Sequence, residues 1–335
     1  MARPSLPKQM RKVSDKALLK RIQDGLELVE VALQKATEHT DPIAKVTARH
    51  LVDAGGKRIR PVLVLLAAQL GKGDNPEVID AAVVVELTHL ATLYHDDVMD
   101  EAPTRRGVST AHNIWGNSVA ILTGDLLFAR ASQVVSRLGE RALTLQADTF
   151  ERLCLGQLHE TVGPQEGEDA VAHYIRVLAD KTGSLIAASA ELGAMFADAP
   201  HKYLEPLRLY GEKIGVAFQL IDDVIDIAEE GESGKTPGTD LRAGVPTLPV
   251  LLLREQAKTD SDAAELLAII DGGLEDDAVL AKAVRRLREH PVAEAAYQEA
   301  KRWADEAVAD LAPLPESHVK DALRNFAEAV VDRSN

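Results

Sequence analysis

The amino-acid sequence predicts an all-α protein, on three observations. Apolar residues recur at intervals of three and four, as in the run that contains Ile79, Val83, Leu87, Leu90 and Tyr94. Only 4% of the residues are aromatic although 46% are hydrophobic, which favours close helix packing over the aromatic and β-branched filling of sheets. The sequence contains no convincing strand series and no glycine-rich turn of the dinucleotide-binding kind.

Similar periodicity predicts helices along most of the chain. They are expected within residues 18–33, 62–70, 119–138, 143–158, 171–195, 214–225, 248–253, 266–287 and 293–311. Glycine and proline clusters separate them, at residues 55–56, 71–76, 163–167, 199–200 and 231–244. None of these clusters is a long flexible linker, so we expect residues 1–335 to form a single domain.

Composition and charge exclude several classes of protein. The net charge of −15 argues against a general nucleic-acid binder, because phosphate backbones need a basic surface. Cys154 is the only cysteine, so no internal disulfide is possible and a reducing compartment fits. The basic N-terminus lacks the apolar stretch of a signal peptide, and residues 61–70, the longest strongly apolar run, are too few to span a bilayer. We expect a cytoplasmic protein without a transmembrane segment.

Two aspartate clusters dominate the polar pattern, DDVMD at residues 96–100 and DDVID at residues 222–226. Each ends an otherwise apolar helix, and its first and last aspartates lie on one helical face because they are four residues apart. Like charges at this spacing destabilise a helix by about 0.2–0.5 kcal/mol, so stability alone would avoid the arrangement. Hard oxygen ligands at a helix end suit Mg²⁺, which usually takes one or two carboxylates plus waters and phosphate oxygens.

The alternative to a metal site is a solvated acidic helix end. That interpretation is adequate for one such motif in an acidic chain, but the recurrence on two apolar helices disfavours it. A third acidic stretch, Glu275-Asp276-Asp277, has Leu280 where another acid would be needed and no apolar helix before it. We expect this stretch at a helix N-terminus, where acidic residues interact favourably with the helix dipole.

Cationic segments accompany both clusters. The segment GGKRIRP at residues 55–61 places three cations after a glycine pair, and Arg105 and Arg106 follow the first cluster. Lys235 follows the second cluster, and Lys181 interrupts another apolar helix. Alone, each of these would be a solvated surface charge. Beside two acid clusters, backbone freedom and positive charge together predict a phosphate-binding site.

Together these motifs resemble the trans-isoprenyl diphosphate synthases, the polyprenyl synthetase family. The resemblance rests on GGKRIRP, then H-x₅-HDDVMDEAPTRRG, a lone Lys-Thr pair, and FQLIDDVID followed by GK, GTDL and TLP. The motif-bearing core runs from about residue 53 to 253, and the C-terminal helices of residues 254–335 are also similar. The resemblance implies a single-domain isoprenoid-synthase barrel of helices around a deep central cavity, with the two clusters facing across it, usually in a homodimer.

The resemblance implies a magnesium-dependent, head-to-tail prenyltransferase. It would condense isopentenyl diphosphate with an allylic diphosphate to give a trans-polyprenyl diphosphate, with three Mg²⁺ ions present when substrate is bound. Metal and cations would stabilise the diphosphate as it leaves, and a dry apolar cavity would protect the allylic carbocation from water. No protein nucleophile is needed, and the departing diphosphate would remove the final proton.

The resemblance also assigns roles residue by residue. Two of the metal ions would be bound by Asp96 and Asp100 and the third by Asp222, with support from Asp97, Asp223 and Asp226. The allylic diphosphate would be held by Arg105, Lys181 and Lys235, with Thr182 and Gln219 nearby. The isopentenyl diphosphate pocket would be formed by Gly56, Lys57, Arg60, His89 and Arg106.

Two of these assignments have an alternative or a gap. His89, taken alone on an apolar helix, would be a core histidine with its hydrogen bonds satisfied inside the protein. Val245 stands where many members of the family have a lysine, and its side chain cannot bind phosphate. We expect that auxiliary contact to be absent or supplied from elsewhere.

In this family the residues just before the first cluster limit the length of the product. The fourth and fifth positions before it are Thr92 and Ala91, both small, and Thr88 lies one turn deeper. A helical turn of ~5.4 Å is about the length of one isoprene unit, so each open turn permits roughly one more condensation. We expect a long product, roughly C30–C50, with geranylgeranyl (C20) diphosphate as the alternative. A neighbouring helix around residues 126–132 would form the floor.

Three rival functions fit the sequence less well. A class I terpene cyclase would carry an Asn/Ser/Glu metal motif in place of the second aspartate cluster. A non-catalytic subunit of a heteromeric prenyl synthase would typically lose one cluster, and this chain keeps both. A helical interaction protein would explain neither cluster.

Overall fold

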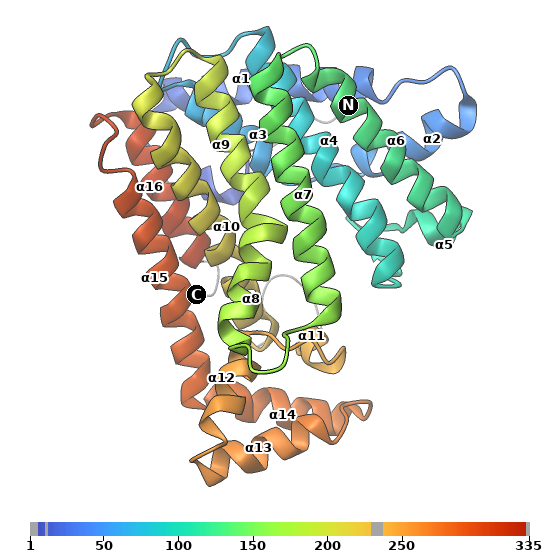
Figure 1. Cartoon of the computed structure of the whole chain (residues 1–335), viewed down its shortest axis with the longest axis vertical. Coiled ribbons are helices and arrows are strands. Elements are labelled where there is room, and N and C mark those ends of the chain that lie inside the picture. Colours follow the sequence, from blue (N-terminus) through green and yellow to red (C-terminus); the bar gives the residue numbers. More distant parts are fainter. Residues whose placement is uncertain (1–5, 11–12, 229–236, 333–335) are drawn as a thin grey trace. The chain divides into compact units, whose positions relative to one another are not determined.

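The structure is a computed structural model of the whole chain, and it describes residues 6–10, 13–228 and 237–332. Most of these residues lie in helices (Figure 1). Within the described ranges the strands are β1 (Thr104–Arg105) and β2 (Val108–Ser109), which pair antiparallel as a small hairpin. The prediction of an all-α protein is therefore confirmed.

The chain divides into two compact units. Unit 1 contains Met1–Glu151, Leu185–Gly211 and Asp310–Asn325, and unit 2 contains Arg152–Ser184, Glu212–Ala309 and Phe326–Asn335. The helices α7 (Glu140–Val162), α10 (Leu204–Asp226) and α16 (His318–Val331) contribute residues to both units. The first residue of α9 (Ser184–Phe196) belongs to unit 2, and the last residue of α15 (Pro291–Asp310) belongs to unit 1. The expectation of a single domain stays a prediction.

Unit 1 contains the first aspartate cluster and the glycine-rich cationic segment. Its elements, besides the hairpin, are η1 (Lys8–Met10), α1 (Lys16–Ala36), α2 (Pro42–Asp53), α3 (Ile59–Ala68), α4 (Pro76–Met99), α5 (Ala111–Trp115), α6 (Asn117–Val135), the first part of α7 (Glu140–Val162), α9 (Ser184–Phe196), η3 (His201–Tyr203), the start of α10 (Leu204–Asp226) and most of α16 (His318–Val331). The sequence pattern did not predict α2 and α5.

The core of unit 1 forms around α3 and α4. Every residue of α3 from Pro61 to Ala68 is buried, and α4 is apolar on most sides up to Tyr94. Asn75 caps the start of α4 by accepting a hydrogen bond from the amide of Val78, at 2.9 Å. Helix α4 therefore crosses the middle of the unit and carries its polar C-terminus out of the core.

Two helices of unit 1 satisfy the length and composition of a membrane span. They are α4, whose most apolar stretch is 72% buried inside the protein, and α6, whose most apolar stretch is 39% buried. The sequence prediction considered only the run at residues 61–70 and missed both. The deep burial of α4 is that of a core helix, whereas α6 leaves an apolar face uncovered.

Unit 2 contains the second cluster and the lone Lys-Thr pair. Its elements are the end of α7, α8 (Ala170–Leu178), the π-helix η2 (Ala179–Gly183), the end of α10, α11 (Thr239–Arg242), α12 (Leu248–Gln256), α13 (Ser261–Asp271), α14 (Asp277–Glu289), α15 (Pro291–Asp310) and the last residues of α16. One cluster of buried residues, including Ile227, Leu253, Leu266 and Leu287, packs α12, α13 and α14 together.

One predicted helix was wrong in its extent. Residues 266–287 form two helices, because the chain turns after α13 at Gly272-Gly273, and Gly273 has a φ of 99°. Asp276 then caps α14 by accepting hydrogen bonds from the amides of Ala278 and Val279. The expectation that the third acidic stretch begins a helix is confirmed.

Candidate active site

The first aspartate cluster lies at the C-terminal end of α4. The helix ends at Met99 and Asp100 is its C-cap, so Asp96 and Asp100 share one face of the last turn. The helix dipole makes acidic residues unfavourable there, by about 0.3–1 kcal/mol each. Local stability therefore does not explain the cluster, whereas a bound cation would compensate for the unfavourable charge.

Asp97 is the inner member of this cluster, and its side chain is 1% exposed. Arg105 of the hairpin donates from Nε to Asp97 Oδ1 at 2.7 Å. Asp97 Oδ2 is buried and has no hydrogen-bond partner within the described residues. Burial raises the pKa of Asp97 above its ordinary value in spite of Arg105. Arg105, predicted to hold substrate, is thus anchored on the cluster itself.

The second cluster repeats this plan at the end of α10. The inner aspartate, Asp223, is 5% exposed and accepts hydrogen bonds from Tyr174 Oη at 2.8 Å and from the amide of Leu248 at 3.2 Å. Burial raises its pKa to about 7. Sequence reasoning missed Tyr174, because no local signal links α8 to a residue 49 positions away.

Asp226 closes the second cluster and organises the segment that follows. Its two carboxylate oxygens accept hydrogen bonds from the amides of Thr239 and Asp240, each at 3.1 Å. Lys235, which was predicted to bind the allylic diphosphate, lies outside the described residues. Val245 is 41% exposed in the loop after α11.

The cationic segment of unit 1 separates its arginines into different roles. Arg58 is buried, with its side chain 2% exposed, and donates to Glu30 of α1 at 2.5 Å and to Glu86 of α4 at 2.8 Å. Its φ of 50° turns the chain between Gly56 and α3. Arg58 therefore fixes the loop from inside, while Gly56 and Lys57 lie on the exposed side.

The structure brings the predicted isopentenyl diphosphate residues of unit 1 together. Arg106 donates to the carbonyl oxygens of Leu51, at 3.0 Å, and of Gly55, and lies 3.7 Å from Glu86. A Cβ on Gly56 would lie 2.8 Å from the guanidinium carbon of Arg106, so a larger residue there would displace this guanidinium. The guanidinium of Arg106 therefore packs directly against the backbone of Gly55 and Gly56.

Arg60 and His89 complete this group. The Nε of Arg60 is buried without a hydrogen-bond partner among the described residues, and burial lowers the pKa of Arg60 to about 10. Burial, together with Arg60 and Arg106, lowers the pKa of His89 well below its usual range. A neutral histidine beside two arginines, one with an unused donor, is suited to receive an anion.

Lys181 and Thr182 lie in η2, where the helical path between α8 and α9 widens into a π turn. Lys181 forms an ion pair with Glu160 of α7. A Cβ on Gly215 of α10 would lie 2.5 Å from Gly183 Cα, so the π turn rests directly on α10. Gly215, Gln219 and Asp222 follow one face of α10, because they are four and three residues apart. The helix predicted over residues 171–195 is present as α8, η2 and α9 in succession, and the sequence pattern did not predict the π turn.

The residues predicted to limit product length are packed tightly. Thr88 and Ala91 are fully buried, and a Cβ on Gly124 of α6 would lie 3.1 Å from the carbonyl oxygen of Ala91. Gln146 of α7 donates to Thr88 Oγ1 at 2.9 Å, a contact that sequence reasoning missed. Thr92 is partly exposed and donates to the carbonyl oxygen of His89 at 2.8 Å.

The carboxylates fit a cation that completes its shell from substrate. Across the described ranges, His, Cys, Asp and Glu side chains do not gather in threes or more as a ready-made metal site. One or two carboxylates per ion, with waters and phosphate oxygens, is nevertheless the usual coordination of Mg²⁺. The first cluster offers two such carboxylates, Asp96 and Asp100, and the second cluster offers one, Asp222.

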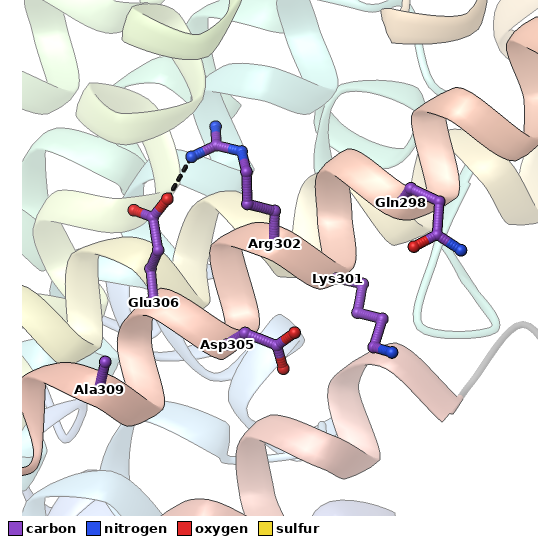
Figure 2. A pocket seen from close by; sticks show the side chains of 6 residues that line it. All are labelled: Gln298, Lys301, Arg302, Asp305, Glu306 and Ala309. Carbon is purple, nitrogen blue, oxygen red and sulfur yellow. Dashed lines mark hydrogen bonds and ion pairs between the residues drawn. The ribbon is translucent and has the colours of Figure 1, made fainter.

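A shallow hollow of about 390 Å³ lies elsewhere in unit 2, on α15 (Figure 2). It is lined by Gln298, Lys301, Arg302, Asp305, Glu306 and Ala309. Arg302 is already paired with Glu299 and Glu306 of the same helix, and none of the predicted site residues is present. The hollow therefore lacks the groups that the candidate chemistry needs.

Fold and site together define a class of all-α enzymes that handle diphosphates through aspartate-rich helix ends. The model of the polyprenyl synthetase family matches residues 41–287. A nonaprenyl diphosphate synthase of Mycobacterium tuberculosis is 43% identical over 324 residues, with 96% of each chain covered. The chain belongs to the polyprenyl synthetase family, and it is a prenyltransferase of the prenyl diphosphate synthase type.

Solved structures agree with this assignment. A geranylgeranyl pyrophosphate synthase from Corynebacterium glutamicum, complexed with calcium and isoprenyl diphosphate, is similar with a TM-score of 0.87 and 44% identity, covering 96% of this chain and 99% of that one. A decaprenyl diphosphate synthase from Rhodobacter capsulatus has a TM-score of 0.85 and 33% identity, covering 95% and 99%. The isoprenoid-synthase fold implied by the motifs is therefore confirmed.

Proposed function

We propose that this protein condenses isopentenyl diphosphate with an allylic diphosphate, using Mg²⁺, to give a long trans-polyprenyl diphosphate. The main support for the proposal is that the C-terminal ends of α4 and α10 have the same arrangement of aspartates. In each cluster the inner aspartate, Asp97 or Asp223, is buried and anchored by a hydrogen-bond donor. That anchoring holds the neighbouring carboxylates at the helix end in place against their mutual repulsion.

The metal would be held by Asp96, Asp100 and Asp222, with Asp97, Asp223 and Asp226 in support. When bound, it neutralises the charge that develops on the departing diphosphate. A relative that holds calcium together with isoprenyl diphosphate supports this role for a divalent cation. Three Mg²⁺ ions remain our proposal for the substrate-bound state.

Two groups of cations would divide the substrates between them. Arg60, Arg106 and neutral His89 would bind isopentenyl diphosphate beside Gly56 and Lys57. Lys181, Thr182 and Gln219 would bind the allylic diphosphate, with Arg105 and Lys235. The unused donor of buried Arg60 supports the first assignment, since a buried donor needs an acceptor. The position of η2 on Gly215, along the face of α10 that carries Gln219 and Asp222, supports the second.

A long product is proposed from the small side chains before the first cluster. Sequence identity does not decide the length, because the nonaprenyl relative at 43% and the geranylgeranyl relative at 44% are equally similar. Ala91 is fully buried against α6, so a phenylalanine there would overpack the core, at a cost of about 1–3 kcal/mol. Partly exposed Thr92 is the better position at which to block a growing chain.

Thr92→Phe is expected to shorten the product by at least one isoprene unit, because the added ring would fill space one turn below Asp96. Thr92→Val keeps the side-chain volume and is the matched control, expected to leave the length unchanged. The products are measured by chromatography after dephosphorylation. An unaltered distribution with Thr92→Phe would overturn the idea that the chain grows past this position.

We also propose that the protein is a cytoplasmic homodimer. Support comes from α6, whose Ile121 and Leu122 are 42% and 65% exposed. Uncovered apolar residues on a helix that also carries a buried face are typical of an interface between subunits. Light scattering of the purified protein is expected to give twice the chain mass of 36.2 kDa. A monomer at micromolar concentration would contradict this part of the proposal.

The reaction is tested by incubating purified protein with isopentenyl diphosphate, Mg²⁺ and each of the C5, C10, C15 and C20 allylic diphosphates. Products longer than C20 that require Mg²⁺ are expected. Products that stop at C20 would keep the reaction and favour the geranylgeranyl alternative. The absence of product from every starter would favour a non-catalytic subunit that needs a partner.

A further inference from the structure

The π-helix η2 is the most unusual backbone feature in unit 2. It comprises Ala179–Gly183, and the amide of Ser184 donates to the carbonyl oxygen of Ala179, five residues earlier. Such turns are rare and occur mostly as single-turn bulges at functional sites. Lys181 and Thr182 lie at its centre, so the geometry of the bulge decides where these two side chains point.

Two neighbouring helices enclose the backbone of this turn. A Cβ on Gly156 of α7 would lie 2.7 Å from the amide nitrogen of Lys181. On the other helix, a Cβ on Gly215 of α10 would lie 2.5 Å from Gly183 Cα and 3.2 Å from the carbonyl carbon of Thr182. Side chains of any size are excluded from both contacts, so the turn is held by backbone packing on α7 and α10.

Arg152 connects the same three elements through its side chain. Its Nε donates to Asp180 of η2 at 2.7 Å, and its Nη1 donates to Glu212 of α10 at 2.6 Å. Its Nη2 also donates to the carbonyl oxygen of Ala179, at 3.4 Å. Arg152 lies one turn before Gly156, and Glu212 lies one turn before Gly215, so the charged bridge runs alongside the glycine contacts.

Lys181 itself is held only weakly through its ammonium group. Its partner Glu160 lies one turn after Gly156 on α7, and the two side chains are 27% and 39% exposed. An ion pair with this exposure contributes about 0–1 kcal/mol. The position of Lys181 is therefore set by the backbone of η2, and a diphosphate can replace Glu160 at low cost.

We propose that Arg152 is a positioning residue for the allylic diphosphate. It locks the π turn between α7 and α10 and so fixes the backbone from which Lys181 and Thr182 reach the substrate. This inference rests on the substrate-binding role proposed above for those two residues. Arg152 is 34% exposed and carries no role in the family resemblance described above.

The test is steady-state kinetics of the full-length protein with Mg²⁺, varying each substrate while the other is saturating. Arg152→Gln is expected to raise the KM for the allylic diphosphate about tenfold, as for supporting residues of metal sites, and to change the KM for isopentenyl diphosphate less than twofold. Arg152→Lys keeps one charged contact and is expected to raise the KM for the allylic diphosphate by an intermediate factor. This variant also provides the test if Arg152→Gln does not fold.

Arg286→Gln is the matched control. Arg286 of α14 also bridges two carboxylates in unit 2, those of Asp262 and Glu265, but both belong to α13 and not to η2 or α10. This variant is expected to leave both KM values unchanged. The inference would be overturned if Arg152→Gln raised both KM values equally, or if neither Arg152 variant raised the KM for the allylic diphosphate. In either case an active wild type would still support the proposed function. A wild type that makes no product would overturn both.

Discussion

The glycine-rich loop in unit 1 and the π turn in unit 2 each carry cations in the same unit as one aspartate cluster, but different forces hold the two segments. The loop of residues 55–60 is fixed by buried ion pairs of Arg58, and the atoms nearest to a Cβ on Gly56 would be those of the Arg106 guanidinium. The π turn is enclosed by backbone, since Gly156, Gly183 and Gly215 all face main-chain atoms.

This difference predicts different responses to substitution. A side chain such as Arg106 can rotate away from an added methyl group, whereas backbone in a close-packed helix contact cannot. The loop is therefore expected to respond mainly to the loss of charge, and the π turn mainly to added volume. Three substitutions test this distinction, in order of decreasing effect on stability.

Arg58→Met is expected to lower the free energy of unfolding by about 3–5 kcal/mol, because it leaves the carboxylates of Glu30 and Glu86 without their buried partner. Urea denaturation measures the change. Arg324→Met is the control in the same unit, since Arg324 also bridges two acids, Glu316 and Asp321, but at the surface. The control is expected to lose less than about 1 kcal/mol. Similar losses in both variants would contradict the role given to Arg58.

Gly215→Ala is expected to lower the free energy of unfolding by about 2 kcal/mol, because its methyl group would overlap the backbone of Gly183. In a helix, alanine is otherwise more stabilising than glycine by about 1 kcal/mol, so any net loss of stability comes from this contact. Thermal or urea denaturation gives the value. A stabilised Gly215→Ala protein would show that η2 has room to move, against the enclosed π turn described here.

Gly56→Ala is expected to have the smallest effect on stability, about 1 kcal/mol, which comes from strain at its φ of 151°. Its methyl group would instead push the guanidinium of Arg106 aside. We therefore expect the KM for isopentenyl diphosphate to rise several-fold while the KM for the allylic diphosphate stays constant. Kinetics with each substrate varied in turn provide the measurement. A selective rise in the allylic KM would reverse the assignment of the two cation groups.

The local features of the site were predictable from sequence. The helices that end in the two aspartate clusters and the helix start at Asp276 follow from spacing and composition, because each depends on residues within a few turns of one another. Periodicity alone, however, predicts one helix over residues 266–287, where the structure has parts of both α13 and α14. A glycine pair weakens a helical pattern without deciding whether the chain turns there.

Long-range partners could not be predicted. Nothing in the segment GGKRIRP indicates that Arg58 points inward to Glu30 and Glu86 while Arg60 keeps an unused donor. Gln146, which donates to Thr88, lies 58 residues from it along the chain. A single sequence contains no signal for such contacts, since they depend on which helices pack together.

The sequence by itself determined that this protein is helical, that it carries two carboxylate clusters at helix ends, and that cations lie near both. Periodicity and charge spacing act over one or two turns and need no tertiary contact. Only the tertiary structure decided which charged side chains are buried in ion pairs, as Arg58 is, and which keep an unused donor, as Arg60 does. Arg58 and Arg152 are held by carboxylates from other helices, and burial between those helices sets the pKa of His89 and of Asp223. Desolvation and pairing are properties of the packed molecule, and they separate residues that look alike in the sequence.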